Sequence, residues 1–124
     1  MPGRRILVID DDKMIHTVMK AAMAKLGHQV FSAFDSVQAP MMARQVKPDL
    51  IVLDMKMPGG GGYEAFRRLQ MMSGTATIPI LVYSSMPAAE VAAHIPPSPS
   101  VAHLPKPSEP DAILAAVQSL LGEA

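Results

Sequence analysis

The sequence contains no cysteine, no long apolar run and no net charge. Without cysteine, disulfide bonds and thiolate chemistry are excluded. No apolar run approaches the roughly 20 residues that a membrane-spanning helix needs. The eleven basic and eleven acidic residues cancel, which argues against a general electrostatic attraction to nucleic acid or anionic lipid. The N-terminus also lacks the layout of a signal peptide, so we expect a cytoplasmic protein.

The length and the hydrophobic content predict one globular domain. The 124 residues are 49% hydrophobic and 18% charged, which is ordinary for a chain that buries its own core. We expect the domain to span residues 1–124, with its core between about residues 5 and 121. The eleven methionines are interpreted as adaptable core filling.

Short apolar runs alternate with segments of helical periodicity along the whole chain. Branched apolar runs and breakers predict strands at residues 4–9, 29–33, 50–53, 78–83 and 101–104. Helices are expected at residues 14–26, 36–46, 63–72 and 88–95, and from Ser108 or Glu109 onward. Pro40 fits only a first turn, so the second helix is expected to start near Ala39. Apolar spacing assigns the inner stripe of the first helix to Ile15, Val18, Met19, Ala22 and Leu26, and that of the last to Ile113, Ala116, Val117 and Leu120.

Strict alternation of strand and helix indicates the α/β class. We predict a five-stranded parallel sheet of order 2-1-3-4-5, in a flavodoxin-like three-layer α/β/α arrangement. The continuous apolar run at residues 50–53 suits a strand that is covered on both faces.

Acidic residues follow two of the predicted strands. Asp10 and Asp11 come directly after the first strand, and Asp54 follows the third. These strands are neighbours where the chain order reverses, which is where open α/β sheets bind ligands. Carboxylates this close repel one another, and a bound divalent cation removes the repulsion. Oxygen ligands without cysteine indicate Mg²⁺.

The same edge of the sheet gathers groups that suit phosphoryl transfer. A carboxylate such as Asp54 can be the nucleophile that receives a phosphoryl group, and a metal there can neutralise developing charge. Ser84 ends the fourth strand and Lys106 follows the fifth, which adds a hydroxyl and a cation. Each residue alone has an ordinary explanation as a cap, turn or surface residue. These ordinary explanations do not require the acidic residues, Ser84 and Lys106 to meet at one edge of the sheet, so their combination favours a functional site.

At this point the chain resembles the receiver domain of bacterial two-component response regulators, from about Arg5 to Leu121. The matching motifs are Ile6-Leu-Val-Ile-Asp10-Asp11-Asp12, Leu53-Asp54-Met-Lys-Met-Pro58 with Gly62, Ser84-Ser85 and Lys106-Pro107. Each motif is weak alone, whereas the four in this order on an alternating chain are specific.

The resemblance implies a role for each acidic residue. Asp54 matches the phosphoacceptor of the family. Asp10 and Asp11 match the acidic pair that holds Mg²⁺, with Asp11 preferred as the direct ligand. The backbone carbonyl of Lys56 matches a further metal ligand.

The resemblance also implies the phosphoryl-binding side chains and the partners. Ser84 matches the hydroxyl that binds the phosphoryl group and shifts on activation, and Lys106 matches the lysine that pairs with it. The Lys106–Pro107 bond is expected to be cis.

A histidine kinase or phosphotransfer protein would donate the phosphoryl group, and the chain would catalyse only its own phosphorylation and dephosphorylation. A downstream protein or a second copy would bind the face of the fourth helix, fifth strand and fifth helix.

The chain departs from the family pattern before the lysine. His103 stands where receivers usually carry Tyr or Phe as a switch residue, and histidine is smaller and polar. From strand alternation we expect Tyr83 and His103 to point to the same side of adjacent strands and to share the switch role. Met86 offers no group that orients water beside the phosphoryl group, which predicts a long-lived phosphorylated state.

The fourth helix is short and rich in alanine, and prolines follow it. One helix face cannot bury all of its apolar residues, so we expect an exposed apolar patch among Ala88, Ala89, Val91, Ala92 and Ile95. The Gly59–Gly62 run lacks the Gly-Lys-Ser/Thr of a phosphate-binding loop and is interpreted as a plain mobile loop. The four histidines show no metal-ligand spacing.

Two other functions stay open at this level. The chain could be a receiver-like interaction module that works without phosphorylation. It could also be a small Mg²⁺-dependent phosphohydrolase with Asp10 as nucleophile and Asp12 as acid. Nothing in the sequence after the last predicted helix indicates a DNA-binding or enzymatic output, so we expect a stand-alone receiver or one cut from a larger regulator.

Overall fold

The computed structural model describes residues 3–57 and 60–123. Pro58 and Gly59, which belong to the motif and glycine run noted above, lie outside the described residues. Within the described chain, strands and helices alternate from β1 to α5. In chain order they are β1 (Arg5–Ile9), α1 (Lys13–Ala24), β2 (Gln29–Ala33), α2 (Gln38–Val46), β3 (Leu50–Leu53), α3 (Gly61–Gln70), β4 (Ile80–Ser84), α4 (Ala88–His94), β5 (Val101–Pro105) and α5 (Pro110–Leu120).

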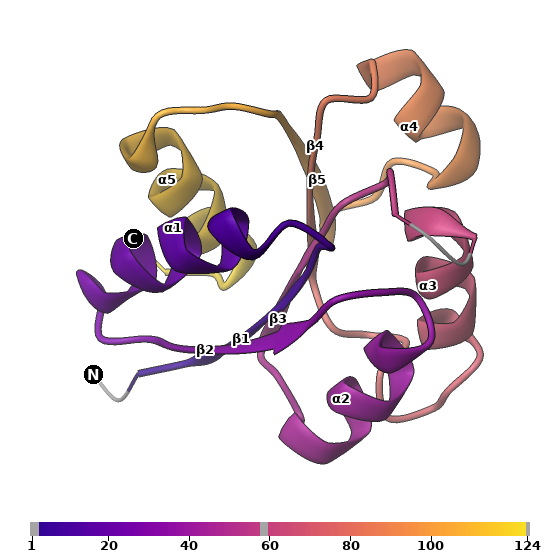
Figure 1. The fold of residues 1–124 in the computed structure, drawn as a ribbon, viewed down its shortest axis with the longest axis horizontal. Helices are drawn as coiled ribbons and strands as arrows, with labels where there is room; N and C mark the ends of the chain where they lie inside the picture. Colours follow the sequence, from indigo (N-terminus) through magenta and orange to yellow (C-terminus); the bar gives the residue numbers. More distant parts are fainter. Residues whose placement is uncertain (1–2, 58–59, 124) are drawn as a thin grey trace.

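The five strands form one parallel sheet of order β2-β1-β3-β4-β5. Figure 1 shows α1 and α5 on one face of this sheet and α2, α3 and α4 on the other. The predicted fold class, strand order and layering are confirmed. Because parallel neighbours need crossover connections, every strand leaves the sheet at the same edge.

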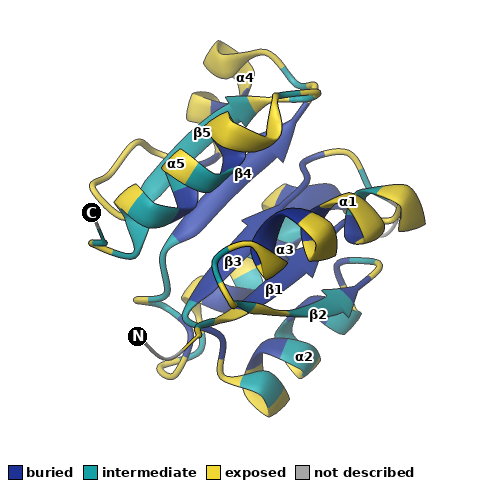
Figure 2. Ribbon diagram, turned by 90° about the vertical axis from the view of Figure 1, so that its left-hand side faces the viewer, coloured by how far each residue is buried: buried dark blue, intermediate teal, exposed yellow. Residues whose placement is uncertain are grey.

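Burial follows from this layering. β3 and β4 are buried throughout and β1 is buried after Arg5, whereas the edge strands β2 and β5 are mostly half-buried (Figure 2). One hydrophobic cluster lies between the sheet and α2, α3 and α4. A second lies between the sheet and α1 and α5. Successive residues of each strand point alternately into the two clusters, which explains the uninterrupted apolar runs.

Local sequence signals place most helix starts. Asp12 caps α1, and its carboxylate accepts a hydrogen bond of 2.9 Å from the Met14 N–H. Pro40 lies in the first turn of α2 and Pro110 opens α5. These starts agree with the predictions, because a proline is tolerated only where the backbone N–H has no partner in the helix.

The inner face predicted for α1 is partly wrong. Its buried residues are His16, Met19, Ala22 and Met23, whereas Val18 is 38% exposed. The spacing 16, 19 and 23 is a helical stripe, but it includes a histidine that apolar periodicity leaves out. In α5 the predicted stripe is confirmed, since Ile113 and Val117 are fully buried.

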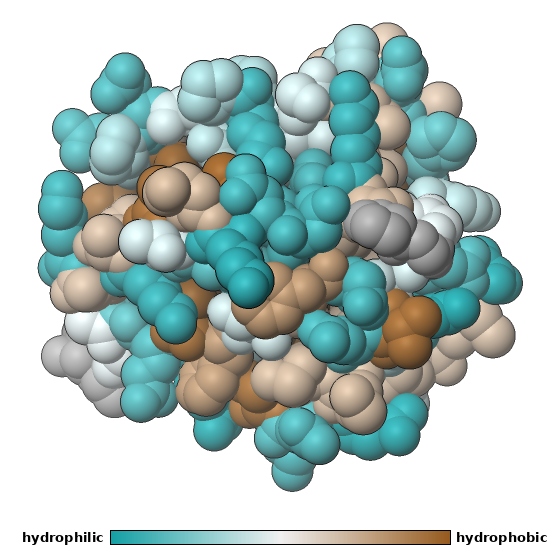
Figure 3. Space-filling view, in the orientation of Figure 1, coloured by the Kyte–Doolittle hydropathy of each residue, from teal (hydrophilic) through white to brown (hydrophobic). Residues whose placement is uncertain are grey.

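Large hydrophobic residues also lie on the surface. Met14, Val37 and Met41 are each more than half exposed, and they belong to α1, the β2–α2 loop and α2. Hydrophobic residues on the face seen in Figure 3 lie among hydrophilic ones over these elements. No helix of the described chain is long and apolar enough to cross a bilayer.

Asp35 stabilises the entry into α2, which predicts a measurable cost for its removal. Its carboxylate accepts hydrogen bonds of 2.9 Å from the Val37 N–H and 2.7 Å from the Gln38 N–H. We expect Asp35→Ala to lower the free energy of unfolding by about 1 kcal/mol, measured by urea denaturation. Asp35→Asn keeps an oxygen acceptor and should lose less than half of that. Equal losses in the two variants would contradict this capping role.

Candidate functional site

Three carboxylates meet at the carboxyl edge of the sheet. Ile9 and Leu53 are directly paired across β1 and β3, so Asp10 and Asp54 leave the sheet side by side. One oxygen each from Asp10, Asp11 and Asp54 lies within 4.8 Å of the others. Asp10 and Asp54 are buried, whereas Asp11 is exposed. The predicted convergence of the two acidic segments is therefore observed.

This group fits a magnesium ion. Oxygens around Mg²⁺ lie about 2.1 Å from the metal, and therefore about 3.0 Å apart when adjacent and about 4.2 Å apart when opposite. The spacing of the three carboxylates allows such a cluster after small movements. Among the described residues no other group of three or more acidic or histidine side chains has metal-binding spacing.

Lys106 supplies the positive charge of the site. Its Nζ lies 2.8 Å from Asp10 Oδ2 and 3.6 Å from Asp54 Oδ2. Partial burial acts to lower the pKa of Lys106, but the hydrogen bond to Asp10 and the nearby carboxylates outweigh it, so the pKa is raised. The ammonium group stays charged and offsets part of the negative charge.

Asp54 is held in an environment that disfavours its ionised form. Burial, and then the charge of Asp10, raise the pKa of Asp54. Lys106, a backbone hydrogen bond from Lys56 and the Ser84 hydroxyl act in the opposite direction without cancelling the shift. The single positive charge of Lys106 does not balance the ionised carboxylates of the site. A metal ion or another cation bound at this edge would therefore be stabilised by the remaining negative charge.

Ser84 is fully buried at the end of β4. Its Oγ accepts a hydrogen bond of 3.2 Å from the Met86 N–H, two residues before α4 begins. Just after the adjacent strand β5, the Lys106–Pro107 bond is cis, as predicted. The structure thus brings Ser84, Lys106 and the acidic residues to one edge.

The expectation that Tyr83 and His103 share a face is wrong. The register pairs Val82 with His103 and Tyr83 with Leu104, and directly paired residues point to the same side. Tyr83 belongs to the cluster beside α1 and α5, whereas His103 lines a cavity of about 260 Å³ beside α4. An offset of one residue sends the two rings to opposite layers.

Tyr83 instead supports the loop that carries Lys106. Its hydroxyl accepts a hydrogen bond of 3.1 Å from the Ser108 N–H. Lys106 Nζ lies 5.9 Å from the centre of the Tyr83 ring, within the range of a cation–π contact. Tyr83 therefore contacts both ends of the short segment from Lys106 to Ser108, the first through its ring and the second through its hydroxyl.

His16 is a residue of the site that the sequence analysis missed. It is buried, and its Nε2 lies 2.7 Å from the Asp10 carbonyl oxygen. Its ring also packs at 4.5 Å from that of Phe34. Because a carbonyl only accepts, Nε2 carries the proton and holds the backbone of Asp10. The helical spacing of His16, Met19 and Met23 is the sequence signal that could have placed His16 on the inner face of α1.

The glycine run is not a plain mobile loop at its described end. Gly61 and Gly62 are buried in the first turn of α3, and the Gly62 N–H donates a hydrogen bond of 3.0 Å to the Met55 carbonyl. A Cβ at Gly62 would lie 2.7 Å from Met55 Cα and would also clash with the Asp54 carbonyl. The absence of a side chain here lets α3 approach the segment that carries Asp54.

The alanine-rich face of α4 is exposed as predicted. Val91 and Ile95 are buried, whereas Ala88, Ala89 and Ala92 are exposed. This face forms one wall of the cavity beside His103.

The fold and the site together define a signalling receiver. The sequence matches the family model of the response regulator receiver domain over residues 6–118, and the chain belongs to this family.

Several relatives and solved structures show the same similarity. The chain is 32% identical over 117 residues, 94% of its length, to the DNA-binding dual master transcriptional regulator RpaA of Synechocystis, but spans only 48% of that protein. It is 28% identical to sporulation initiation phosphotransferase F of Bacillus subtilis, covering 98% of this chain and 96% of that one. The receiver domain of a sensor histidine kinase from Pseudomonas aeruginosa, solved with a magnesium ion in its active-site cleft, superposes with a TM-score of 0.86 at 24% identity, covering 98% and 99% of the two chains.

The raised pKa of Asp54 predicts that the ionised site costs stability. Below the unfolded pKa, about 3.9, Asp54 is protonated in both states. As pH rises through the higher folded pKa, the folded protein loses stability relative to the unfolded chain. Asp54→Asn is always neutral, so we expect it to melt a few degrees higher than the wild type at pH 7 in a chelating buffer. That difference should shrink towards pH 4, measured by differential scanning calorimetry.

The matched control for this prediction is Asp49→Asn, because Asp49 is a partly exposed carboxylate at the opposite edge of the sheet. It should not raise the melting temperature at pH 7. A lower melting temperature for Asp54→Asn than for the wild type at pH 7 would contradict the electrostatic account.

Proposed function

We propose that this chain is a phosphorylation-dependent switch in which Asp54 receives a phosphoryl group from a histidine kinase or phosphotransfer protein. The observation that carries the proposal is the position of Lys106 Nζ between Asp10 and Asp54, beside three clustered carboxylates. The family match supports it, as does a relative of nearly equal length that is named as a phosphotransferase. We also propose a cytoplasmic location for the protein, in keeping with a phosphoryl donor of this class.

The residues of the site suit transfer from phosphohistidine. A carboxylate oxygen of Asp54 attacks phosphorus, the P–N bond breaks, and the imidazole leaves with its electron pair and takes a proton. Lys106 needs to move little to pair with a phosphoryl oxygen. Asp10, Asp11 and Asp54, with the Lys56 carbonyl, would hold Mg²⁺. When bound, the ion would supply positive charge that neutralises the carboxylates and the transferred group.

A hydrogen-bond exchange at Ser84 would carry the change away from the site. The Ser84 hydroxyl oxygen now accepts from the Met86 N–H. If the hydroxyl moved to donate to a phosphoryl oxygen, that bond would be broken and the start of α4 would be free to shift. Phosphorylation would thus be coupled to the cavity between α4 and β5, where His103 lies. We propose His103 as the switch residue of this face and Tyr83 as a support of the Lys106 loop.

The α4–β5–α5 face is the proposed site for a downstream partner or a second copy. Exposed alanines of α4 and the cavity beside them offer an apolar surface without like-charge repulsion.

One alternative function is disfavoured by a specific contact. In the phosphohydrolase hypothesis Asp12 acts as an acid, but the Asp12 carboxylate is exposed and accepts the Met14 N–H as the cap of α1. It is also outside the carboxylate group. The other alternative, an interaction module that works without phosphorylation, would use the same α4 face. It differs from the proposed switch in that its partner binding would not change when Asp54 is phosphorylated.

Intact-mass analysis after incubation with acetyl phosphate tests the proposal. With about 10 mM Mg²⁺ we expect a gain of about 80 Da, one phosphoryl group, and no gain in chelating buffer. Asp54→Ala should remain unmodified. The control Asp49→Asn should be modified as the wild type is. Modification of Asp54→Ala, or modification that does not need Mg²⁺, would contradict the assignment.

The apolar side chain of Met86 predicts a long phosphoryl lifetime. Met86 packs against the apolar cluster beside α2, α3 and α4 and carries no group that activates water. We expect Met86→Glu to shorten the half-life of the phosphorylated domain at least about threefold, since a positioned carboxylate can act as a general base. Met86→Leu is the matched control, and phosphate release after donor removal is the measurement. Hydrolysis at equal rates in both variants would refute this role.

A further inference from the structure

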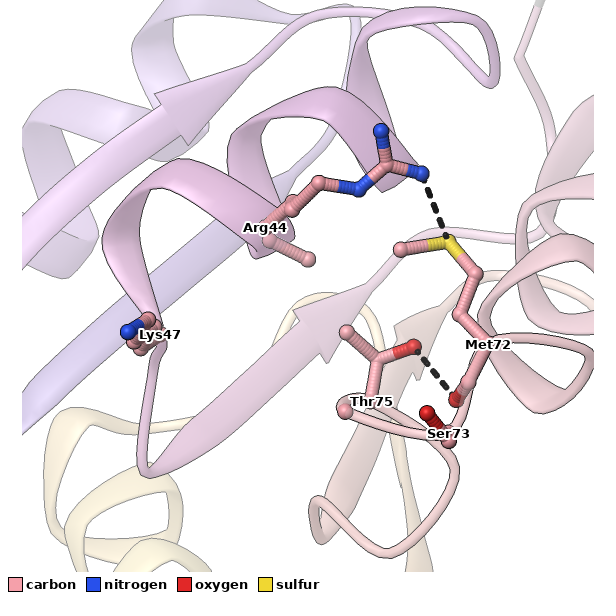
Figure 4. Close-up of a pocket in the computed structure, with 7 residues that line it drawn as sticks. Arg44, Lys47, Met72, Ser73 and Thr75 are labelled. Carbon is pink, nitrogen blue, oxygen red and sulfur yellow. Dashed lines mark hydrogen bonds between the residues drawn. The ribbon is translucent and has the colours of Figure 1, made fainter.

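A second concave site lies at the opposite edge of the sheet from Asp54. An open cavity of about 490 Å³ is lined by the last turn of α2 and the loop that joins α3 to β4 (Figure 4). Its volume falls in the range of small-molecule sites, about 300–1,000 Å³. Lys47 lies three residues before β3 and Thr75 five residues before β4, so the cavity opens at the amino edge. A ligand there would not touch the phosphoryl site.

The charge of the cavity is positive. Arg44 and Lys47 line it, and none of its seven lining residues is acidic. Among the ion pairs of the described chain, neither residue has a carboxylate partner. The Arg44 guanidinium instead points at Met72, with Nη2 3.9 Å from the thioether sulfur (Figure 4). Sulfur is a weak acceptor, so the guanidinium can exchange this contact for an anion.

The opposite wall is already ordered. The Thr75 hydroxyl donates to the Leu69 carbonyl at 2.6 Å, and the N–H groups of Thr75 and Ala76 donate to the Met72 carbonyl at 3.1 and 3.0 Å. These bonds tie the loop to the end of α3. The partly exposed side chain of Met72 supplies apolar surface beside the Arg44 guanidinium (Figure 4). A preformed wall reduces the entropy lost on binding.

We propose that this cavity binds a small amphipathic anion, a carboxylate or phosphate monoester carried on a short apolar group. The Arg44 guanidinium presents paired donors that match either oxyanion, and Lys47 adds a second positive charge. The apolar part of the ligand lies on Met72. The site is separate from the proposed phosphoryl switch and does not depend on it.

NMR titration of the ¹⁵N-labelled chain tests this with four probes: octanoate, hexyl phosphate, inorganic phosphate and hexanol. We expect saturable shifts of residues 43–47 and 72–75 with octanoate or hexyl phosphate, at a dissociation constant of about 1 mM or tighter. Tighter binding of octanoate would indicate a carboxylate ligand, and tighter binding of hexyl phosphate a phosphate ligand. Inorganic phosphate and hexanol should each bind at least about tenfold more weakly, because each supplies only half of the required chemistry.

Charge-matched variants identify the residues that bind. The double variant Arg44→Gln with Lys47→Gln should weaken binding of the better probe at least about tenfold. Lys20→Gln with Lys25→Gln removes the same charge from exposed positions in α1 and just after it and should leave the binding unchanged. Gly74→Glu should also weaken binding, because a Cβ at Gly74 meets no atom within 4 Å and its carboxylate would compete for the two cations.

Several outcomes would overturn the proposal. They are the absence of saturable shifts with both amphipathic anions, equal binding of inorganic phosphate, and equal loss in the two double variants. Binding of an acidic peptide at these residues without binding of either small anion would replace it with a protein-docking site. Phosphorylation of Asp54 is measured separately on each variant, so a failure here leaves the proposed switch untouched.

Discussion

Two buried carboxylates that share one ammonium group set the main constraint on this structure. Asp10 and Asp54 are nearly inaccessible to solvent, and Lys106 Nζ lies within 4 Å of both. Charges removed from water are costly unless they are paired and hydrogen-bonded. Here one lysine faces three carboxylates, and burial, followed by the charge of Asp10, raises the pKa of Asp54. The site therefore carries unbalanced negative charge that a cation can relieve, which is the physical basis for both metal binding and phosphoryl acceptance in the proposed function.

Much of the surrounding structure serves to hold this unfavourable arrangement in place. His16 binds the Asp10 carbonyl from α1, and the missing side chain of Gly62 lets α3 approach the backbone of Asp54. Tyr83 holds the loop after Lys106 through Ser108. These contacts come from three different elements, and each acts on the backbone beside a charged residue. The backbone beside the charged side chains is thus held by contacts that are themselves uncharged, which pre-organises the site.

The sites at the two edges of the sheet have opposite electrostatic character. Strand ends, acidic residues and Lys106 meet at the carboxyl edge, where every strand of a parallel sheet leaves. At the amino edge, the end of α2 places Arg44 and Lys47 over a cavity that has no acidic residue in its lining. β3 joins the two regions through four buried residues. This separation would let the two proposed ligands bind without competing.

The sequence alone determined the parallel sheet, its strand order and the acidic edge, because these follow from alternating strand and helix signals and from residues that end strands. Local chemistry also located Asp12 as a helix cap and Pro40 and Pro110 in first turns. The tertiary structure decided the rest. Apolar periodicity could not show that His16 replaces Val18 on the inner face of α1. It also could not show that β5 pairs with β4 in a register that sends Tyr83 and His103 to opposite layers. Register and helix rotation depend on contacts between segments far apart in the chain, and a one-residue change in either reverses which side chains are buried.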